Sequence, residues 1–186
     1  MAWADIRTFY TDGACKGNPG PGGWAFVELD NIGKDLVGFD YVNDIPDTTN
    51  NRMELTAILA VCEVIKKSVV YEKNTTYIIY SDSAYCVNLI NTWMWSWARC
   101  GWYNNKKEEI ANKDLVKELY CFFDQYKGLV MVEKIPGHSK VLGNEIADRL
   151  ATGKKQEVKK LLNDAGYDVD YTCTGWLSGK LLLNEV

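Results

Sequence analysis

The stretch that decides the fold reads Phe9-Tyr10-Thr11-Asp12-Gly13-Ala14-Cys15-Lys16-Gly17-Asn18-Pro19-Gly20-Pro21-Gly22-Gly23. The β-branched and aromatic residues that lead into it predict a strand. Asp12 comes where that strand ends, and the glycines after it let backbone approach whatever the carboxylate binds. An isolated Asp-Gly pair usually marks an ordinary turn. No Gly-Lys-Ser/Thr follows, which excludes a phosphate-binding P-loop.

The composition predicts one compact folded chain. It has 186 residues, 47% of them hydrophobic, with seven tryptophans. No run approaches the ~18 apolar residues that cross a bilayer, so we expect no membrane contact and a cytoplasmic protein. Six cysteines without a Cys-x-x-Cys pair favour free thiols. Cys62 and Cys121 fall in helical apolar patterns, so we expect both to be buried.

Charge is unevenly distributed along the chain. The formal net charge is −4, which does not suggest a nucleic-acid-binding protein. Residues 93–140 carry +2, however, whereas residues 1–92 carry −5. This basic region also holds five aromatic residues, Trp93, Trp95, Trp97, Trp102 and Tyr103. A basic stretch is most often a solvated face, but interleaved aromatics make it a candidate surface for phosphates.

Hydrophobic periodicity predicts an α/β protein. The strands are expected at 6–11, 24–29, 36–42, 77–80 and 130–135. The helices are expected at 51–68, 85–90, 115–126, 144–152 and 156–165, with Asp114 as the cap of the third. The first three strands read as an antiparallel meander. This order indicates a mixed sheet with helices packed on its faces.

Four carboxylates occupy comparable places along this pattern. Asp12 and Asp82 end strands, Glu54 opens a helix, and Asp148 lies in the last core helix. Such positions converge on one crevice in a mixed α/β sheet, where four carboxylates cannot all stay ionised without a counter-charge. Hard oxygen ligands favour Mg²⁺ or Mn²⁺, and two ions about 4 Å apart can drive phosphodiester hydrolysis. Taken singly, these carboxylates have ordinary explanations. Asp82 could cap a helix, Glu54 could be a first-turn acid favoured by the helix dipole, and Asp148 could pair with Arg149 on the surface.

His138 is the chain's single histidine, in the sequence Pro136-Gly137-His138-Ser139. A lone histidine is more often structural or idle. This one lies in a glycine-flanked segment that leads into the helix of Asp148. Its pKa range suits proton transfer to a leaving group or from water.

Several separated motifs resemble those of type 1 ribonuclease H in order and spacing. They are Thr11-Asp12-Gly13, Gly17-Asn18-Pro19-Gly20-Pro21-Gly22-Gly23, Thr49-Asn50-Asn51-Arg52-Met53-Glu54-Leu55, Ser81-Asp82-Ser83, Gly137-His138 and Asn144-Glu145-x-Ala147-Asp148. The resemblance implies the ribonuclease H-like fold, a five-stranded mixed sheet of three antiparallel and two parallel strands with helices on both faces. It also implies a catalytic domain at 1–153 and a C-terminal extension with a short helix at 154–186.

The same resemblance implies an endonuclease that hydrolyses the RNA strand of RNA–DNA hybrids and leaves 5′-phosphate and 3′-hydroxyl ends. Asp12, Glu54, Asp82 and Asp148 would hold two Mg²⁺ ions, for which Mn²⁺ can substitute. His138 would assist proton transfer and product release.

The resemblance also assigns a substrate surface. Residues of the motifs that face the hybrid are Cys15, Gly17, Asn18, Asn50, Asn51, Ser83 and Asn144. Thr49 and Asn112 match a pocket for a DNA-strand phosphate, and a basic protrusion contributes Trp93, Trp97, Arg99 and Trp102. Ala84 and Ala98-Arg99-Cys100 depart from the usual pattern of a base-contacting Gln and a denser basic cluster. We therefore expect weaker binding and a shallower salt dependence than in more basic relatives.

Two alternatives stay open. One is a hybrid-binding module with weak catalysis, which predicts a missing carboxylate. The other is a DNA nuclease on the same fold, because a fold does not determine a function. Asn18, Asn50 and Asn51 argue against it, since hydroxyl-reading groups distinguish RNA from DNA. We expect a monomer with no obligate protein partner.

Overall fold

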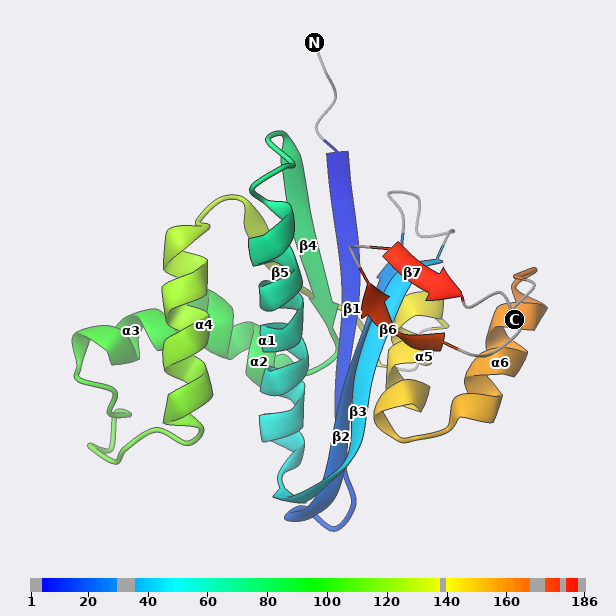
Figure 1. Ribbon diagram of the computed structural model, residues 1–186. Coiled ribbons are helices and arrows are strands. Elements are labelled where there is room, and N and C mark those ends of the chain that lie inside the picture. Colours follow the sequence, from blue (N-terminus) through cyan, green and yellow to red (C-terminus); the bar gives the residue numbers. More distant parts are fainter. Residues whose placement is uncertain (1–4, 30–35, 138–139, 168–172, 178–179, 184–186) are drawn as a thin grey trace.

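The computed structural model describes residues 5–29, 36–137, 140–167, 173–177 and 180–183. The strands are β1 (Asp5–Cys15), β2 (Gly20–Leu29), β3 (Leu36–Thr48), β4 (Thr75–Ser81), β5 (Val130–Lys134), β6 (Cys173–Leu177) and β7 (Lys180–Leu183). The helices are α1 (Asn50–Ser68), α2 (Ala84–Asn88), η1 (Leu89–Trp93), α3 (Met94–Arg99), α4 (Lys113–Gln125), α5 (Leu142–Ala151) and α6 (Lys155–Asp164). Figure 1 shows the central sheet between two groups of helices.

The central sheet has five strands in the order β3-β2-β1-β4-β5. β1 pairs antiparallel with β2, and β2 pairs antiparallel with β3, as the meander predicted. β4 lies parallel to β1 and β5 lies parallel to β4. The predicted mixed sheet is therefore confirmed. Parallel pairing brings the carboxyl ends of β1 and β4 to the same edge, which positions the site described below.

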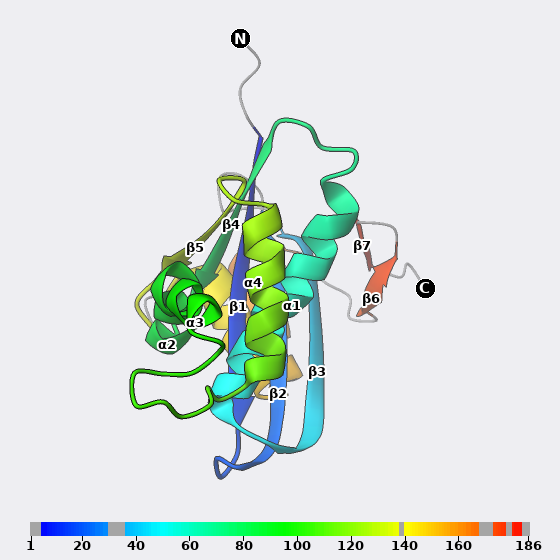
Figure 2. The ribbon, with the colours of Figure 1, turned by 90° about the vertical axis from the view of Figure 1, so that its left-hand side faces the viewer.

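Each face of the sheet carries its own hydrophobic core. α1, α4 and the α2–α3 segment cover one face, where Phe9 and Phe26 are buried. α5 and α6 cover the other, where Tyr10 and Val27 are buried. Successive residues of a strand point to opposite faces, so β1 and β2 contribute to both cores. Figure 2 shows α1 and α4 side by side across the first of these faces.

The third strand is longer than its apolar pattern predicts. We expected it at 36–42, but β3 continues to Thr48 and includes Pro46. Proline has no N–H to donate, and it is tolerated here because β3 is an edge strand. Irregularities in the β2–β3 register and positive φ angles at Asp44 (59°) and Asp47 (48°) accompany this continuation.

Helix boundaries differ in two places. The helix expected at 85–90 is α2, and it runs through the π-helical turn η1 into α3 without leaving helical backbone. Asp114 lies in the first turn of α4 rather than at its cap, which is Asn112 in the left-handed conformation (φ 53°). Thr49 caps α1 with its side chain, which accepts a hydrogen bond from the Arg52 N–H.

The C-terminal extension contains more structure than the expected short helix. α6 is present, and β6 and β7 form an antiparallel hairpin that lies against β3. Only Ser178-Gly179 separates the two strands in the sequence. Two short strands carry little periodicity, and an isolated hairpin is stable only when it packs on something else. This explains why the pattern alone did not predict it.

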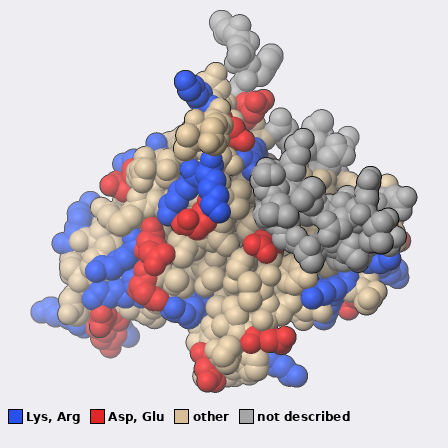
Figure 3. Space-filling model, viewed as in Figure 1, with Lys and Arg blue, Asp and Glu red and all other residues tan. Residues whose placement is uncertain are grey.

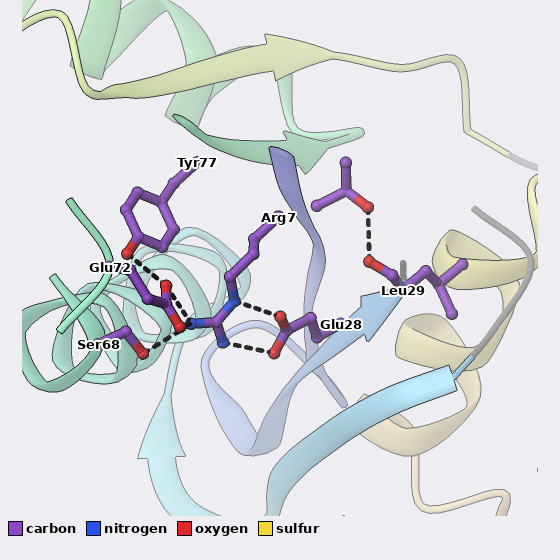
Figure 4. Close-up of polar contacts among 7 residues, drawn as sticks. Arg7, Glu28, Leu29, Ser68, Glu72 and Tyr77 are labelled. Atoms are coloured by element: carbon purple, nitrogen blue, oxygen red, sulfur yellow. Dashed lines mark hydrogen bonds and ion pairs between the residues drawn. The ribbon is translucent and has the colours of Figure 1, made fainter. Parts of the chain in front are cut away.

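A polar network lies within the fold, near the start of β1 (Figure 4). The Arg7 guanidinium forms two hydrogen bonds with the Glu28 carboxylate of β2, one of them 2.8 Å long. Its Nη1 also binds Glu72 at 3.0 Å and Ser68 Oγ at 2.7 Å. The Glu28 side chain is only 2% exposed, so its carboxylate has lost almost all contact with water. The hydrogen bonds from Arg7 compensate for that lost hydration. The network joins β1 and β2 to the end of α1.

The two cysteines that fall in helical apolar patterns differ in burial. Cys62 is buried as expected, but Cys121 is exposed on α4, so that prediction is wrong. The apolar pattern around Cys121 belongs to neighbouring turns of α4, where Leu119 and Phe122 face the core. Within the described residues, none of the helices has both the length and the apolar character needed to cross a membrane.

Candidate active site

Asp12, Glu54 and Asp82 converge beside the carboxyl end of β4. The first strand was expected to end at Asp12, but β1 continues to Cys15 because its pairing with β2 runs on past Asp12. Each of the three residues offers a carboxylate oxygen, and these oxygens lie within 4.8 Å of one another. Asp12 and Glu54 are buried, with relative exposures of 8% and 5%. Asp82 is half-buried. Residues that are far apart in the sequence therefore form one compact acidic cluster.

The local fold explains this convergence. Thr11 pairs with Ser81, so Asp12 and Asp82 follow neighbouring positions of parallel strands. Gly13 then lets α1 approach the strand, since a Cβ at that position would lie 2.1 Å from the Glu54 nitrogen. Any other residue would push the first turn of α1, and Glu54 with it, away from Asp12. The Asp-Gly pair is thus part of the site rather than an ordinary turn.

The electrostatics of the cluster are unfavourable without a cation. Burial raises the pKa of Asp12 well above its usual range, and the negative charges of Asp82 and Asp148 raise it further. Burial also raises the pKa of Glu54, and the charges of Asp12 and Asp82 raise it further. A hydrogen bond from the Gly13 N–H lowers the pKa of Glu54, but by less. A divalent cation would relieve this repulsion.

The donor set fits a hard divalent metal. Glu54 Oε2 is buried and has no hydrogen-bond partner, so it is available as a ligand. Asn144 of α5 donates a hydrogen bond from Nδ2 to Asp82 Oδ2 at 3.3 Å, and its own Oδ1 is likewise unpartnered. Carboxylate and amide oxygens of this kind are the ligands that Mg²⁺ and Mn²⁺ prefer.

Asp148 lies at the rim of this cluster rather than inside it. It comes from α5 and is close enough for its charge to raise the pKa of Asp12. Its side chain is 35% exposed, however, and its Oδ2 lies 3.6 Å from Arg149 Nη1. The surface pair that sequence reasoning weighed as an ordinary role thus exists beside the cluster. The half-buried Asp148 carboxylate would have to turn from Arg149 to reach a cation held by the other three.

One cation near the cluster was missed by sequence reasoning. Lys134 ends β5 and pairs with Ser81, the residue before Asp82. Its positive charge lowers the pKa of Glu54, although burial and the other carboxylates outweigh it. Its Nζ donates a hydrogen bond to the Ile135 carbonyl at 2.6 Å. In the sequence it lies one residue before the expected end of the strand at 130–135, a position that many lysines share.

The residues predicted to contact the hybrid form two groups beside the carboxylates. In the first, the Asn50 N–H donates to Asn18 Oδ1 at 3.0 Å, so the glycine loop and the start of α1 are joined. Cys15 lies next to them and its Sγ approaches the carbonyls of Gly20 and Thr48 at 3.4 and 3.2 Å. Gly17 adopts a positive φ of 94°, which the loop requires.

The second group lies between the first turns of α1 and α4. Arg52 reaches Asn112 Oδ1 from Nη1 at 3.4 Å and binds Asp114 through both terminal nitrogens, at 3.0 and 2.6 Å. Thr49 caps the same turn from which Arg52 projects. Thr49 and Asn112, the two residues assigned to a phosphate pocket, thus flank the Arg52 guanidinium. Arg52 is part of a sequence motif, but the motif assigned it no role. The pair of Arg52 with Asp114 keeps the guanidinium in place.

The Trp-rich protrusion presents aromatic rings at a surface cavity. Trp93 and Trp97 have ring centroids 5.9 Å apart and line a cavity of about 350 Å³ together with Lys106. Trp102 instead packs edge-on against Tyr120 of α4, and Arg99 is exposed. Figure 3 shows basic and acidic side chains intermingled over this α3–α4 side. The surface is therefore of mixed charge, in line with the modest +2 of residues 93–140.

With this geometry in view, comparison with known proteins identifies the family. The model of the RNase H family matches residues 5–156. The chain belongs to the ribonuclease H family. The curated ribonuclease H of Rickettsia typhi is 39% identical over 158 residues, which cover 84% of this chain and 95% of that protein. The ribonuclease H of Syntrophomonas wolfei is 45% identical over 144 residues, 76% of this chain and 90% of its own length.

Solved structures show the same fold. LC9-RNase H1, a type 1 RNase H with the type 2 active-site motif, is 25% identical, with a TM-score of 0.63 over 84% of this chain and 75% of that chain. LC11-RNase H1 in complex with RNA/DNA hybrid is 20% identical, with a TM-score of 0.60 over 80% of this chain and 99% of that chain. The ribonuclease H fold expected from the motifs is therefore confirmed.

Two further residues predicted for the site of this ribonuclease H family member are Ser83 and His138. Ser83 caps α2: its hydroxyl accepts a hydrogen bond from the Cys86 N–H at 3.3 Å. Ser83 directly follows Asp82 in the chain. His138 lies outside the described residues, so its role stays a prediction. Gly137, just before it, approaches Asp82 so closely that a Cβ there would lie 3.3 Å from Oδ2. The chain thus reaches the acidic cluster immediately before His138.

Proposed function

We propose that this ribonuclease H hydrolyses the RNA strand of RNA–DNA hybrids with Mg²⁺, through Asp12, Glu54, Asp82 and Asp148. The observation that carries the proposal is the cluster of three carboxylates within 4.8 Å, two of them buried and one half-buried. One buried oxygen of this cluster, Glu54 Oε2, has no hydrogen-bond partner. Mg²⁺ ions held there would activate the attacking water and stabilise the leaving oxygen of the phosphodiester, as two-metal sites do. Mn²⁺ would satisfy the same ligands.

The protein's own residues supply orientation and charge around the reacting phosphate. Asn144 holds the Asp82 carboxylate through the Nδ2 hydrogen bond, and the Gly13 N–H holds Glu54. Asp148, half-buried at the rim, would accept a proton or hold a water molecule on the solvent side of the cluster. We assign proton transfer at the leaving group to His138. Hydrolysis would leave the phosphate on the 5′ end and a hydroxyl on the 3′ end.

The substrate surface follows from the two groups of side chains. Asn18 and Asn50, joined to each other, would contact the minor groove, where the 2′-hydroxyl distinguishes RNA from DNA. Thr49, Arg52 and Asn112 would hold a phosphate of the DNA strand. The paired rings of Trp93 and Trp97 would lie against the same strand. We propose that a single copy of the chain carries the complete site and acts as a monomer.

A cleavage assay tests the proposal. Wild-type protein is incubated with three substrates of one sequence, an RNA–DNA hybrid, duplex DNA and single-stranded RNA, with Mg²⁺ or with EDTA. We expect cleavage of the RNA in the hybrid alone, only with Mg²⁺, and 5′-phosphate ends by end-labelling. Asp12→Asn should lose turnover by at least ~10³-fold, whereas Asp124→Asn, on the exposed face of α4, serves as a charge-matched control. Cleavage of duplex DNA at a comparable rate would favour the DNA nuclease, and binding without cleavage would favour the weak hybrid-binding module.

A further inference from the structure

A pocket of about 560 Å³ opens between the β1–β2 loop and the junction of α5 with α6. Both segments lie towards the lower end of the molecule in Figure 1. The lining combines backbone of the glycine loop with residues of β3 and of the α5–α6 junction. Its polar and charged members are Lys16, Asn43, Asp44, Thr152 and Lys155. None of these was assigned to substrate binding by the sequence motifs.

The pocket adjoins the acidic cluster along two elements. Cys15, which lines it, is the third residue after Asp12 in β1, a rise of about 10 Å along the strand. Thr152, on the opposite wall, follows Asp148 by four residues, or about 6 Å along the helix. Nucleic-acid charges recur about every 3.4 Å of axis along one strand. Because the strand winds around that axis, its phosphates lie farther apart in space than the axial rise, so a strand cut at the cluster would reach the pocket within about three nucleotides of the cleaved bond.

Two lysines from distant parts of the chain give the pocket its charge. Lys16 comes from the glycine loop and is exposed. Lys155 is the first residue of α6, and its Nζ lies 4.9 Å from the centroid of the Tyr41 ring. The ring holds the ammonium group at the pocket while leaving its N–H donors available. Asp44 is the one acid in the lining, so the pocket has a net positive charge.

The walls are built from fixed backbone. Asn43 Nδ2 donates hydrogen bonds to the carbonyls of Leu150 and Ala151, at 2.9 and 3.1 Å, and so ties β3 to the end of α5. Gly23 allows the close approach, because a Cβ there would lie 2.5 Å from the Ala151 oxygen. The Lys16 N–H is bonded to the Pro21 carbonyl at 2.8 Å, which fixes the base of the loop. The backbone that carries Lys16 and the ring beside Lys155 are thus fixed, and both lysines line the same hollow.

We infer that this pocket binds phosphates of the RNA strand within about three nucleotides of the cleaved bond, with Lys16 and Lys155 as its phosphate contacts. The inference rests on the proposed function, since the cleaved strand must pass over the carboxylates. Helix α6, which lies outside the motifs of the core, would then contribute to substrate binding through Lys155. Asp44 opposes the phosphate and limits the affinity of the site.

Binding of a catalytically inactive protein to a hybrid tests the inference. In the Asp12→Asn background, the dissociation constant of a labelled RNA–DNA hybrid is measured from 50 to 300 mM salt. Removing two phosphate contacts with Lys16→Gln and Lys155→Gln should reduce the slope of log K against log salt by about 1.4–1.8. With equal affinities at about 1 M salt, this weakens binding by roughly 25–60-fold at 0.1 M salt. Asp44→Asn should strengthen binding by about two- to fivefold. Lys160→Gln, a charge-matched change on the exposed face of α6 outside the pocket, should leave the slope within error.

Neutral methylphosphonate linkages locate the contact on the strand. When they are placed one at a time in the RNA within about three nucleotides of the cleaved bond, at least one of them should weaken binding to the protein with both lysines and have no effect once both are replaced. An effect only from neutral linkages in the DNA strand, or an unchanged slope in the double variant, would overturn the inference. Urea denaturation of each variant separates lost binding from lost folding. Lys155→Arg, which keeps the positive charge, should retain hybrid binding. Wild-type cleavage of the unmodified hybrid is scored separately, so the pocket can fail while the nuclease assignment stands.

Discussion

Replacing Asp12 by asparagine should make the metal-free protein more stable while abolishing its catalysis. Asp12, Glu54 and Asp82 place carboxylate oxygens within 4.8 Å of one another. At that separation and an effective dielectric constant of about 20, two unit charges repel each other by about 3.5 kcal/mol. The buried carboxylates are not all ionised at once, so asparagine recovers only part of this energy. We expect the free energy of unfolding to rise by about 1–3 kcal/mol at pH 8.

The effect should depend on pH with a defined sign. The pKa values of Asp12 and Glu54 are raised in the folded protein, so folding favours their protonated forms. Below the usual pKa range of a carboxyl group, both states are protonated and the cluster imposes no penalty. As the pH rises through the raised pKa values, the wild-type protein loses stability. The advantage of Asp12→Asn should therefore be largest near pH 8 and disappear near pH 3.

Urea denaturation followed by tryptophan fluorescence measures this difference. Both proteins are unfolded in EDTA at several pH values, and then at pH 8 with added Mg²⁺. The wild type should gain stability from Mg²⁺ because the ion binds the folded state, and the variant should gain less. Asp124→Asn should change the free energy of unfolding by less than about 0.5 kcal/mol. If Asp12→Asn is no more stable than wild type in EDTA at pH 8, the carboxylates do not repel each other as argued.

Three further outcomes follow from contacts outside the cluster. Lys134→Gln should tighten Mg²⁺ binding about two- to fivefold by calorimetry without substrate, because a competing cation is removed; unchanged affinity would show that Lys134 does not act on the site. Asn43→Ala should cost about 1–3 kcal/mol of stability in urea, since two carbonyls at the end of α5 lose their donor, and a loss below ~0.5 kcal/mol would contradict this role. Glu28→Gln should cost about 2–4 kcal/mol because Arg7 loses its buried partner. Glu63→Gln, which breaks an exposed pair, should cost under ~0.5 kcal/mol.

Much of the fold could be predicted because its signals are local. Alternation before Asp12, the apolar stripe of α1 and the turn residues between strands each depend on residues close in sequence. The failures were also local in origin. β3 ran past its apolar pattern because an edge strand tolerates Pro46. The β6–β7 hairpin was missed because four or five residues per strand carry too little periodicity to predict.

The sequence by itself determined which residue types were available: acidic side chains at strand ends and helix starts, and glycines where backbone must approach backbone. Only the tertiary structure decided their depth and their neighbours. Strand pairing and the packing of α1 bury Asp12 and Glu54, whereas Asp148 stays at the rim beside Arg149. The same packing brings Lys16 and Lys155 to one pocket from opposite ends of the chain. Distances between residues remote in sequence depend on how strands pair and helices pack, and no local pattern records them.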